Sequence, residues 1–182
     1  MPVDMKSMIA DTLNQLLCQK SLDKITVKEL VEACHISRQT FYYHFQDIME
    51  VIEWYQHKML EQSIAASLAA PNGRDAIKGM VQEAFRHKEL IRQLMASQRR
   101  AQIEQLFLRT IRTYLEEMLR QKAPELPLSP ADVETVLQFY SGGIVWLMLS
   151  SLEQKEPDVD ALSRQIYRLL SGELTFRFAG QA

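Results

Sequence analysis

Apolar residues recur every three or four positions along nearly the whole chain, which is the spacing of one face of an α-helix. No stretch alternates between apolar and polar residues for long enough to predict a β-strand. The pattern therefore predicts an all-α fold of about nine helices.

Three of the predicted helices are short and lie within the first 47 residues. The first covers residues 5–20. Thr26, with Glu29 three positions later, has the capping-box sequence that begins a second helix. Ser37 is a suitable N-cap for a third helix, whose inward residues are Phe41 and Phe45. These three helices form a small N-terminal head.

Six further predicted helices, most of them longer, make up the rest of the chain. Asp47 is a suitable cap for the first of them. The later breaks and helix ends are expected at Pro71-Asn72-Gly73, Pro124, Pro127, Ser129-Pro130, Asp158 and Gly172. The change of helix length near Asp47 predicts two domains, a head of residues 1–47 and a body of residues 48–182.

Composition points to an ordinary soluble protein. Of the 182 residues, 47% are hydrophobic and 24% charged. The two cysteines, Cys18 and Cys34, form no CxxC motif, which is typical of a reduced intracellular protein. The longest charge-free apolar run, residues 139–152, is shorter than the roughly 20 residues of a membrane span. With no signal peptide in the first ten residues, we expect a cytoplasmic protein without a membrane segment.

Residues 24–45 have the pattern of a helix-turn-helix, in which two short helices are joined by a tight turn and the second enters the DNA major groove. The predicted turn is Cys34-His35-Ile36. Ile36 is expected to fill the angle between the helices, and Ala33 to be small because the helices approach closely there. Residues 37–44 are the predicted recognition helix.

The recognition helix carries side chains suited to reading DNA. Arg38 can form a bidentate pair with guanine or bind phosphate, and Gln39 can pair similarly with adenine. Thr40 can contact a phosphate or a thymine methyl group. Three consecutive residues, Tyr42, Tyr43 and His44, cannot all face inward on one helix, so we expect their polar ends to face the duplex.

The run Phe41-Tyr42-Tyr43-His44-Phe45 resembles the TetR family, whose members have phenylalanine or leucine, tyrosine, a variable residue and then His-Phe at this place. The resemblance covers roughly the first 55 residues. The same run, followed by Ile52-Glu53-Trp54-Tyr55, also resembles the branch that contains regulators of dihydroxyacetone kinase operons. The resemblance to the TetR family implies a dimeric transcriptional regulator controlled by a small-molecule or protein effector bound in its C-terminal helical domain.

The family pattern assigns Thr26 and Tyr42 to phosphates, His44 to the DNA backbone, and Arg38, Gln39 and Tyr43 to base edges or nearby phosphates. With their neighbours, the expected DNA-binding residues are Thr26, Ser37, Arg38, Gln39, Thr40, Tyr42, Tyr43 and His44. Two positions depart from the pattern. His35 replaces the usual glycine of the turn, and Ile48 replaces a lysine that usually opens the fourth helix. Residues 1–60 also contain six Lys/Arg against eight Asp/Glu. We therefore expect DNA binding to depend on hydrogen bonds and helix N-termini more than on counterion release, and to be weaker than for a basic protein.

In the body we expect an effector pocket and a two-fold interface. The candidate pocket residues are Phe85, Leu94, Met95, Phe107, Thr110, Tyr114, Phe139, Tyr140 and Trp146. The eighth helix is apolar nearly all round, and glycines 142 and 143 allow close backbone approach, so it and the ninth helix are expected to form the homodimer. The candidate interface residues are Val133, Val136, Tyr140, Gly143, Ile144, Leu147, Leu162, Ile166 and Leu169. A dimer of this type reads a pseudo-palindromic operator in double-stranded DNA.

Other functions have weaker support. Glu32 and His35 spell ExxH, but a di-iron site needs a second such motif and two further glutamates. We therefore expect no metal, no cofactor and no catalytic residues. One alternative is a TetR-shaped interaction module that acts through a protein partner without strong DNA binding of its own. The other is a small all-α enzyme or ligand carrier.

Overall fold

The computed structural model describes residues 4–122 and 128–175. Over these residues the chain forms nine α-helices and one short 3-10 helix, with no β-strand, which confirms the predicted all-α fold. The helices are α1 (Met5–Leu17), η1 (Leu22–Lys24), α2 (Val27–Ala33), α3 (Arg38–His44), α4 (Ile48–Ala69), α5 (Gly73–Arg86), α6 (Lys88–Met95), α7 (Arg100–Lys122), α8 (Pro130–Leu152) and α9 (Val159–Leu170).

The chain packs into two compact units, and each unit is built from two separate segments. Unit 1 comprises Met1–Gln62 and His87–Thr110, and unit 2 comprises Ser63–Arg86 and Ile111–Ala182. The long helices α4 and α7 therefore contribute residues to both units.

Side-chain caps explain where several helices begin. Thr26 accepts a hydrogen bond from the backbone N–H of Glu29 at 3.2 Å, while the Glu29 carboxylate pairs with Lys20. Ser129 caps α8 directly before Pro130, as predicted. Asp158 caps α9, which ends before Gly172 at a φ of 76°. The predicted breaks at Pro124 and Pro127 lie outside the described residues.

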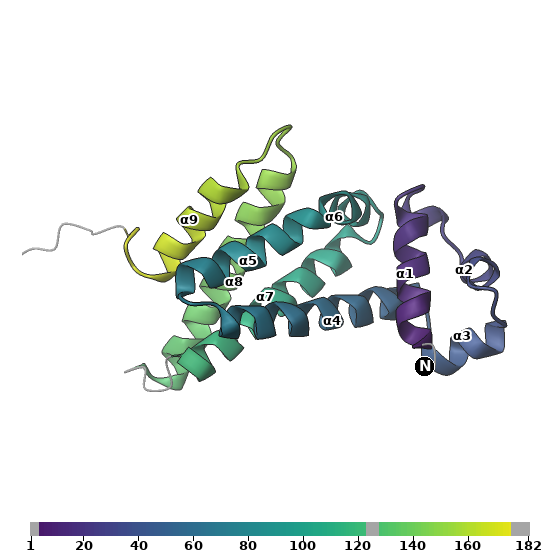
Figure 1. The fold of residues 1–182 in the computed structure, drawn as a ribbon, viewed down its shortest axis with the longest axis horizontal. Coiled ribbons are helices and arrows are strands. Elements are labelled where there is room, and N and C mark those ends of the chain that lie inside the picture. The colour runs from purple at the N-terminus through teal and green to yellow at the C-terminus, as the bar shows by residue number, and fades with distance from the viewer. Residues whose placement is uncertain (1–3, 123–127, 176–182) are drawn as a thin grey trace, which may run out of the picture. The chain divides into compact units, whose positions relative to one another are not determined.

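In unit 1, α1 packs against α2 and α6, and α2 packs against α3 (Figure 1). The apolar stripe of α1 is buried through Ile9, Leu13 and Leu17. Leu30 of α2 and Phe41 of α3 are also fully buried. These residues form the core on which the two helices of the helix-turn-helix pack.

In unit 2, α5 lies along α9, and α9 packs on α8. Lys78 pairs with Asp160 at 3.0 Å, and the Arg74 guanidinium lies 5.5 Å from the centroid of the Tyr167 ring. Both contacts join α5 to α9, with Leu162 and Ile166 buried on α9. Polar contacts at the surface and apolar burial beneath them therefore both hold α9 on α5.

A bidentate ion pair connects α7 to α8 within unit 2. Two nitrogens of Arg112 donate to the two carboxylate oxygens of Glu134, both at 2.6 Å, and Nε donates to Glu116 at 2.9 Å. The hydrogen bonds with Glu134 raise the pKa of Arg112, and those with Arg112 lower the pKa of Glu134. Because the pair is exposed to solvent, its main effect is to set the geometry of the two helices.

Helix α8 is long and apolar enough to cross a membrane by length and composition alone. It nevertheless belongs to unit 2, where it buries Leu137, Ile144 and Val145. Its apolar composition is therefore partly explained by packing within the chain.

Candidate nucleic-acid interface

The turn of the helix-turn-helix has the left-handed residue that its sequence suggested. His35 has a φ of 54°, a conformation that suits glycine better than histidine. Its N–H donates to the carbonyl of Glu32 at 3.2 Å, and the N–H of Ile36 donates to that of Val31 at 3.0 Å. The expectation for Ala33 is wrong, because this residue is exposed and Cys34 is the buried neighbour. Burial raises the pKa of the Cys34 thiol, against a smaller opposite effect of a hydrogen bond with Thr12.

The recognition helix α3 is held from both ends. The Ser37 hydroxyl accepts a hydrogen bond from the backbone N–H of Thr40 at 2.9 Å, which fixes the first turn. Phe41 and Phe45 are 0% and 2% exposed, as predicted, and anchor the inner side of the helix. The Phe45 ring also lies 6.1 Å from that of Trp54 in α4, measured between centroids.

The outer side of α3 presents four polar side chains together. Arg38 and Gln39 are exposed, and Tyr42 and Tyr43 follow one turn later with 56% and 83% of their surface exposed. At about 100° per residue, the four positions span an arc of about 140° on the helix. Within the described part of the chain, none of the four makes a hydrogen bond or ion pair. Their polar groups are therefore available to a partner.

The other expected DNA-binding residues are placed less openly. Thr26 is exposed at the start of α2, where its oxygen already caps the helix. Thr40 is half-buried and shares a hydrogen bond of 2.8 Å with the Ser37 hydroxyl. His44 is half-buried with its ring edge-on to that of Tyr43. Local contacts therefore already occupy part of the hydrogen-bonding capacity of these residues.

Most of the acidic side chains in the first 60 residues have a hydrogen-bond or ion-pair partner inside the protein. Asp4, Asp47 and Glu50 cap helices. Asp23 accepts a hydrogen bond from the backbone N–H of Gln98 at 3.0 Å. The remaining acidic residues form ion pairs: Glu29 with Lys20, Glu32 with Lys28, and Glu53 with Arg109. Of the eight acids only Asp11 has no such partner in the described residues. Hydrogen bonds to backbone N–H groups leave a carboxylate charged, so of these contacts only Arg109 adds a cation from outside the first 60 residues.

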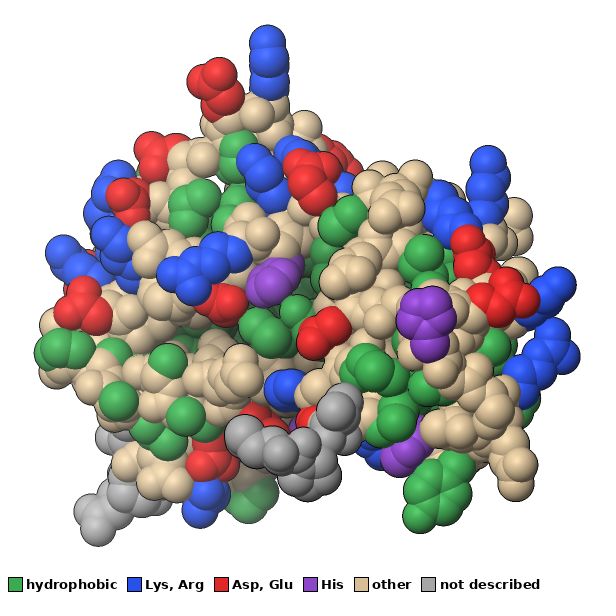
Figure 2. Space-filling model, turned by 45° about the vertical axis from the view of Figure 1, so that its right-hand side comes forward, with side chains coloured by type: hydrophobic (Ala, Val, Ile, Leu, Met, Phe, Trp, Pro, Cys, Tyr) green, Lys and Arg blue, Asp and Glu red, His purple; other side chains and the backbone are tan. Residues whose placement is uncertain are grey.

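Four basic residues in the same segment have no ion pair with a carboxylate among the described residues: Lys6, Lys24, Arg38 and Lys58, of which Lys58 donates to the Ser7 hydroxyl. On the face drawn in Figure 2, acidic and basic side chains are interspersed. Sequence reasoning missed the position of Lys6, whose ammonium lies 5.2 Å from the centroid of the Phe45 ring. No local pattern signals this contact, because it joins α1 to the end of α3.

No group of three or more His, Cys, Asp or Glu side chains that could hold a metal ion occurs among residues 4–122 and 128–175. Glu32 of the ExxH sequence lies 4.0 Å from Lys28, on the exposed side of α2. The ExxH sequence here is part of a helix end and its turn.

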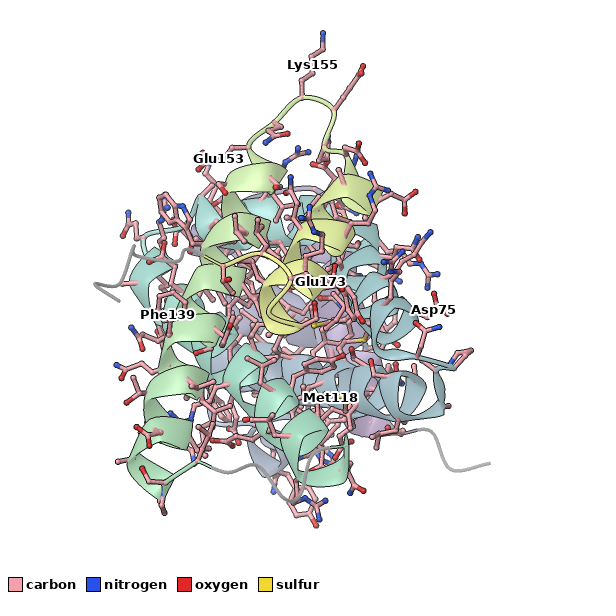
Figure 3. The ribbon with its side chains drawn as sticks, turned by 90° about the vertical axis from the view of Figure 1, so that its left-hand side faces the viewer. Asp75, Met118, Phe139, Glu153, Lys155 and Glu173 are labelled. Atoms are coloured by element: carbon pink, nitrogen blue, oxygen red, sulfur yellow. The ribbon has the colours of Figure 1, made fainter. Side chains whose placement is uncertain are left out.

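The candidate pocket residues divide between the units. Leu94 and Phe107 of unit 1 are buried, while Met95 and Thr110 are half-buried. In unit 2, Phe85 and Tyr114 are buried and Tyr140 is half-buried. The Tyr114 hydroxyl donates to the Ser67 hydroxyl at 2.8 Å, and burial raises its pKa. Phe139 and Trp146 differ from the rest, being 73% and 70% exposed on α8. Figure 3 shows Phe139 on the outer side of this helix.

The candidate interface residues also separate by burial. Ile144, Leu162 and Ile166 are 3%, 5% and 0% exposed, because unit 2 packs them between its own helices. These three residues therefore expose almost no side-chain surface to a second copy of the chain. The half-buried or exposed members are Val133, Val136, Tyr140, Gly143, Leu147 and Leu169. The Tyr140 hydroxyl donates to the carbonyl of Leu169 at 3.1 Å, which joins α8 to α9.

Comparison with known families accounts for most of the chain. Residues 9–53 match the family described as bacterial regulatory proteins, tetR family. Residues 73–172 match a transcriptional regulator C-terminal region of the same family. The chain belongs to the TetR family. The first match includes the helix-turn-helix, and the second includes α5 to α9.

Solved structures of TetR-type regulators share this fold at low sequence identity. The dihydroxyacetone kinase operon activator DhaS is 16% identical, with a TM-score of 0.70 over 94% of this chain and 96% of its own. A TetR transcriptional regulator from Streptococcus agalactiae 2603V is 15% identical, with a TM-score of 0.65 over 91% and 92%. A regulator from Streptomyces coelicolor A3(2) is 15% identical, with a TM-score of 0.60 over 90% and 96%. No protein of curated function matches the chain by sequence.

Proposed function

We propose that this TetR-family protein is a cytoplasmic, dimeric DNA-binding regulator without enzymatic activity, in which residues 1–47 read the operator and residues 48–182 bind an effector and form the dimer. The observation that carries the proposal is the outer side of α3. Arg38, Gln39, Tyr42 and Tyr43 are exposed together there, on a helix anchored by two buried phenylalanines.

In the proposed complex, α3 lies in the major groove. Arg38 and Gln39, in its first turn, contact base edges, because bidentate donors and acceptors there distinguish the four base pairs. Tyr43 contacts bases or a nearby phosphate, and Tyr42 and Thr26 contact phosphates through their hydroxyl groups. Ser37, Thr40 and His44 support this arrangement at the two ends of the helix. Binding therefore depends on hydrogen bonds more than on net charge.

Dimerisation is proposed through one face of α8. Val136, Phe139, Gly143 and Trp146 are spaced three, four and three residues apart, so they form one stripe on the helix. Two large aromatic side chains on this stripe are more than two-thirds exposed, which is unfavourable for a protein that stays single. A Cβ at Gly143 would meet nothing within 4 Å in the described residues, so this glycine serves no close contact inside the chain. To read two half-sites, the two recognition helices of such a dimer have to lie about 34 Å apart, one DNA turn, or somewhat more.

The effector is proposed to act from the body on the spacing of the two heads. An effector that binds one spacing better than the other shifts the population toward it by its difference in affinity. Phe139 and Trp146 leave the predicted pocket set, because the proposed dimer stripe uses them. The similar protein DhaS is named as an operon activator. The effector of this chain could therefore either favour DNA binding or release the protein from DNA.

The decisive experiment is a selection from random duplex DNA at low salt. The native protein is compared with an Arg38→Ala/Tyr42→Phe variant, and light scattering and circular dichroism check that both are folded and equally dimeric. Enrichment of an inverted repeat by the native protein alone supports a dimeric, sequence-specific regulator and identifies its operator.

Enrichment of the same repeat by both proteins would contradict the assigned reading surface. No enrichment by a folded native dimer would favour the alternative, a TetR-shaped interaction module that acts through a protein partner.

A further inference from the structure

The start of α4, two residues after the recognition helix and its cap, is occupied by acidic side chains. The Asp47 carboxylate accepts from the backbone N–H of Glu50 at 2.9 Å, and the Glu50 carboxylate accepts from that of Gln46 at 2.5 Å. A helix N-terminus can bind phosphate through its free amides, but here the Asp47 carboxylate takes the amide of Glu50, and the two carboxylates repel a phosphate. The first residue of the helix, Ile48, adds no charge. A DNA phosphate at this junction therefore needs a positive charge from another element.

Lys6 in the first turn of α1 supplies a positive charge at this junction. Its ammonium lies 5.2 Å from the centroid of the Phe45 ring, and Phe45 is the C-cap of α3. Figure 1 shows the first turn of α1 beside the C-terminal end of α3. In the part of the chain that the structure describes, no carboxylate pairs with Lys6, and the nearby Asp4 is engaged by the N–H and hydroxyl of Ser7.

We propose that Lys6 is a DNA-positioning residue, which binds a backbone phosphate at the junction of α3 and α4. The Phe45 ring holds the lysine while its ammonium keeps hydrogen-bonding capacity for a phosphate. The contact attaches the last turn of the recognition helix to the DNA backbone from outside the helix-turn-helix. This inference rests on the proposed DNA-binding function.

A purely structural role is the competing explanation. A cation near the C-terminus of α3 is favourable for the helix dipole, and its contact with Phe45 stabilises the head with or without DNA. Lys58 makes a matched contact that serves as the control. Its ammonium lies 5.3 Å from the centroid of the Trp54 ring and donates to the Ser7 hydroxyl at 2.6 Å. Its backbone is ten residues beyond Ile48, about 15 Å further along α4, and its ammonium, unlike that of Lys6, is already held by a hydroxyl in the first turn of α1.

The test measures operator affinity as a function of salt concentration, using the selected inverted repeat and an unrelated duplex, for the native protein and for Lys6→Gln, Lys6→Arg and Lys58→Gln. Each lost phosphate contact lowers the slope of log affinity against log salt by about 0.9. Because a dimer carries two copies of Lys6, we expect Lys6→Gln to lower the slope by about 1.8 on both duplexes. Lys6→Arg and Lys58→Gln should keep the native slope.

A double variant, Lys6→Gln/Ile48→Lys, returns a positive charge to the same junction and should restore the native slope even if thermal stability stays lower. An unchanged slope in Lys6→Gln, while the native protein binds its operator, would overturn the role of Lys6 and leave the proposed function intact. An equal loss of slope in Lys58→Gln would also overturn it, because the effect would then not depend on position. If the native protein binds neither duplex, both the proposed function and this inference fail.

Discussion

Helices α3 and α8 both expose large aromatic side chains, but they do so in opposite chemical settings. On α3, Tyr42 and Tyr43 stand beside Arg38 and Gln39, so each exposed ring carries or adjoins a hydrogen-bonding group. On α8, Phe139 and Trp146 lie on a stripe with Val136 and Gly143, where the indole N–H of Trp146 is the one side-chain group of the four that can form a hydrogen bond. The first surface suits a polar, hydrated partner such as DNA. The second suits an apolar surface of another protein chain.

The buried side of α3 gives the largest expected effect. Phe41→Ala removes a fully buried ring and should lower the free energy of unfolding of the head by about 3–5 kcal/mol. Tyr43→Ala, only two positions away but 83% exposed, should change it by less than about 0.5 kcal/mol. Urea unfolding followed by circular dichroism measures both, and comparable losses would mean that the outer side of α3 is also part of the core.

The apolar stripe of α8 gives the next effect. If a second copy covers it, Trp146→Ala should weaken the dimer by about 2–4 kcal/mol, which is at least about thirtyfold in the dissociation constant. Gly143→Leu should weaken the dimer while it stabilises the protomer slightly, because leucine favours a helix more than glycine does. Sedimentation equilibrium gives the dimer affinity, and Leu68→Ala, an exposed leucine on α4, is the control. A native dissociation constant in both α8 variants would exclude this stripe as the interface.

Two substitutions on the outer side of α3 separate base contacts from phosphate contacts. Gln39→Ala should relax the preference at particular base pairs by about 1–3 kcal/mol. Tyr42→Phe should weaken binding by about 1 kcal/mol to every sequence alike. Affinities for all single-base variants of the operator decide the matter, and an equal loss at every position for Gln39→Ala would remove its base-reading role.

A buried tyrosine provides the smallest effect and a contrast to the exposed ones. Tyr114→Phe removes the hydrogen bond that the Tyr114 hydroxyl donates to the Ser67 hydroxyl and should cost about 1 kcal/mol. Burial raises the pKa of Tyr114 above its ordinary value of 10.0, so the unfolded chain loses this proton first. Stability from this group is therefore full below pH 10.0 and declines as the pH rises further.

Urea unfolding of both proteins between pH 9 and 11 measures this difference. The native protein should lose more stability than the variant above pH 10.0, and parallel pH profiles would contradict the raised pKa.

The local features of the fold were predictable from sequence because they depend on neighbouring residues. Ser37, Ser129 and Asp158 cap the helices that their sequences suggested, and His35 has the positive φ expected of its place in the turn. The two phenylalanines of α3 follow from helical spacing in the same way. Such features need no knowledge of the rest of the chain.

The division of α8 between core and surface was not predictable, because its apolar residues surround the helix. Periodicity finds an inner face only when the outer face is polar. Nothing in the local sequence shows that Ile144 faces inward while Trp146, two residues later, faces outward. Contacts between distant segments, such as Lys6 with Phe45 and Ser67 with Tyr114, were not predictable either, because no local sequence pattern connects residues on different helices.

The hydrogen bond from Gln98 to Asp23 has a consequence for the order in which the protein is made. It joins residues 75 positions apart, and α6, which packs on α1, also comes from the later segment of unit 1. At about 5–20 residues per second, the ribosome completes the helix-turn-helix several seconds before it supplies these contacts. During that interval α1 lacks the part of its packing that α6 provides. The chain therefore obtains a finished DNA-reading head only after synthesis has passed well into the body.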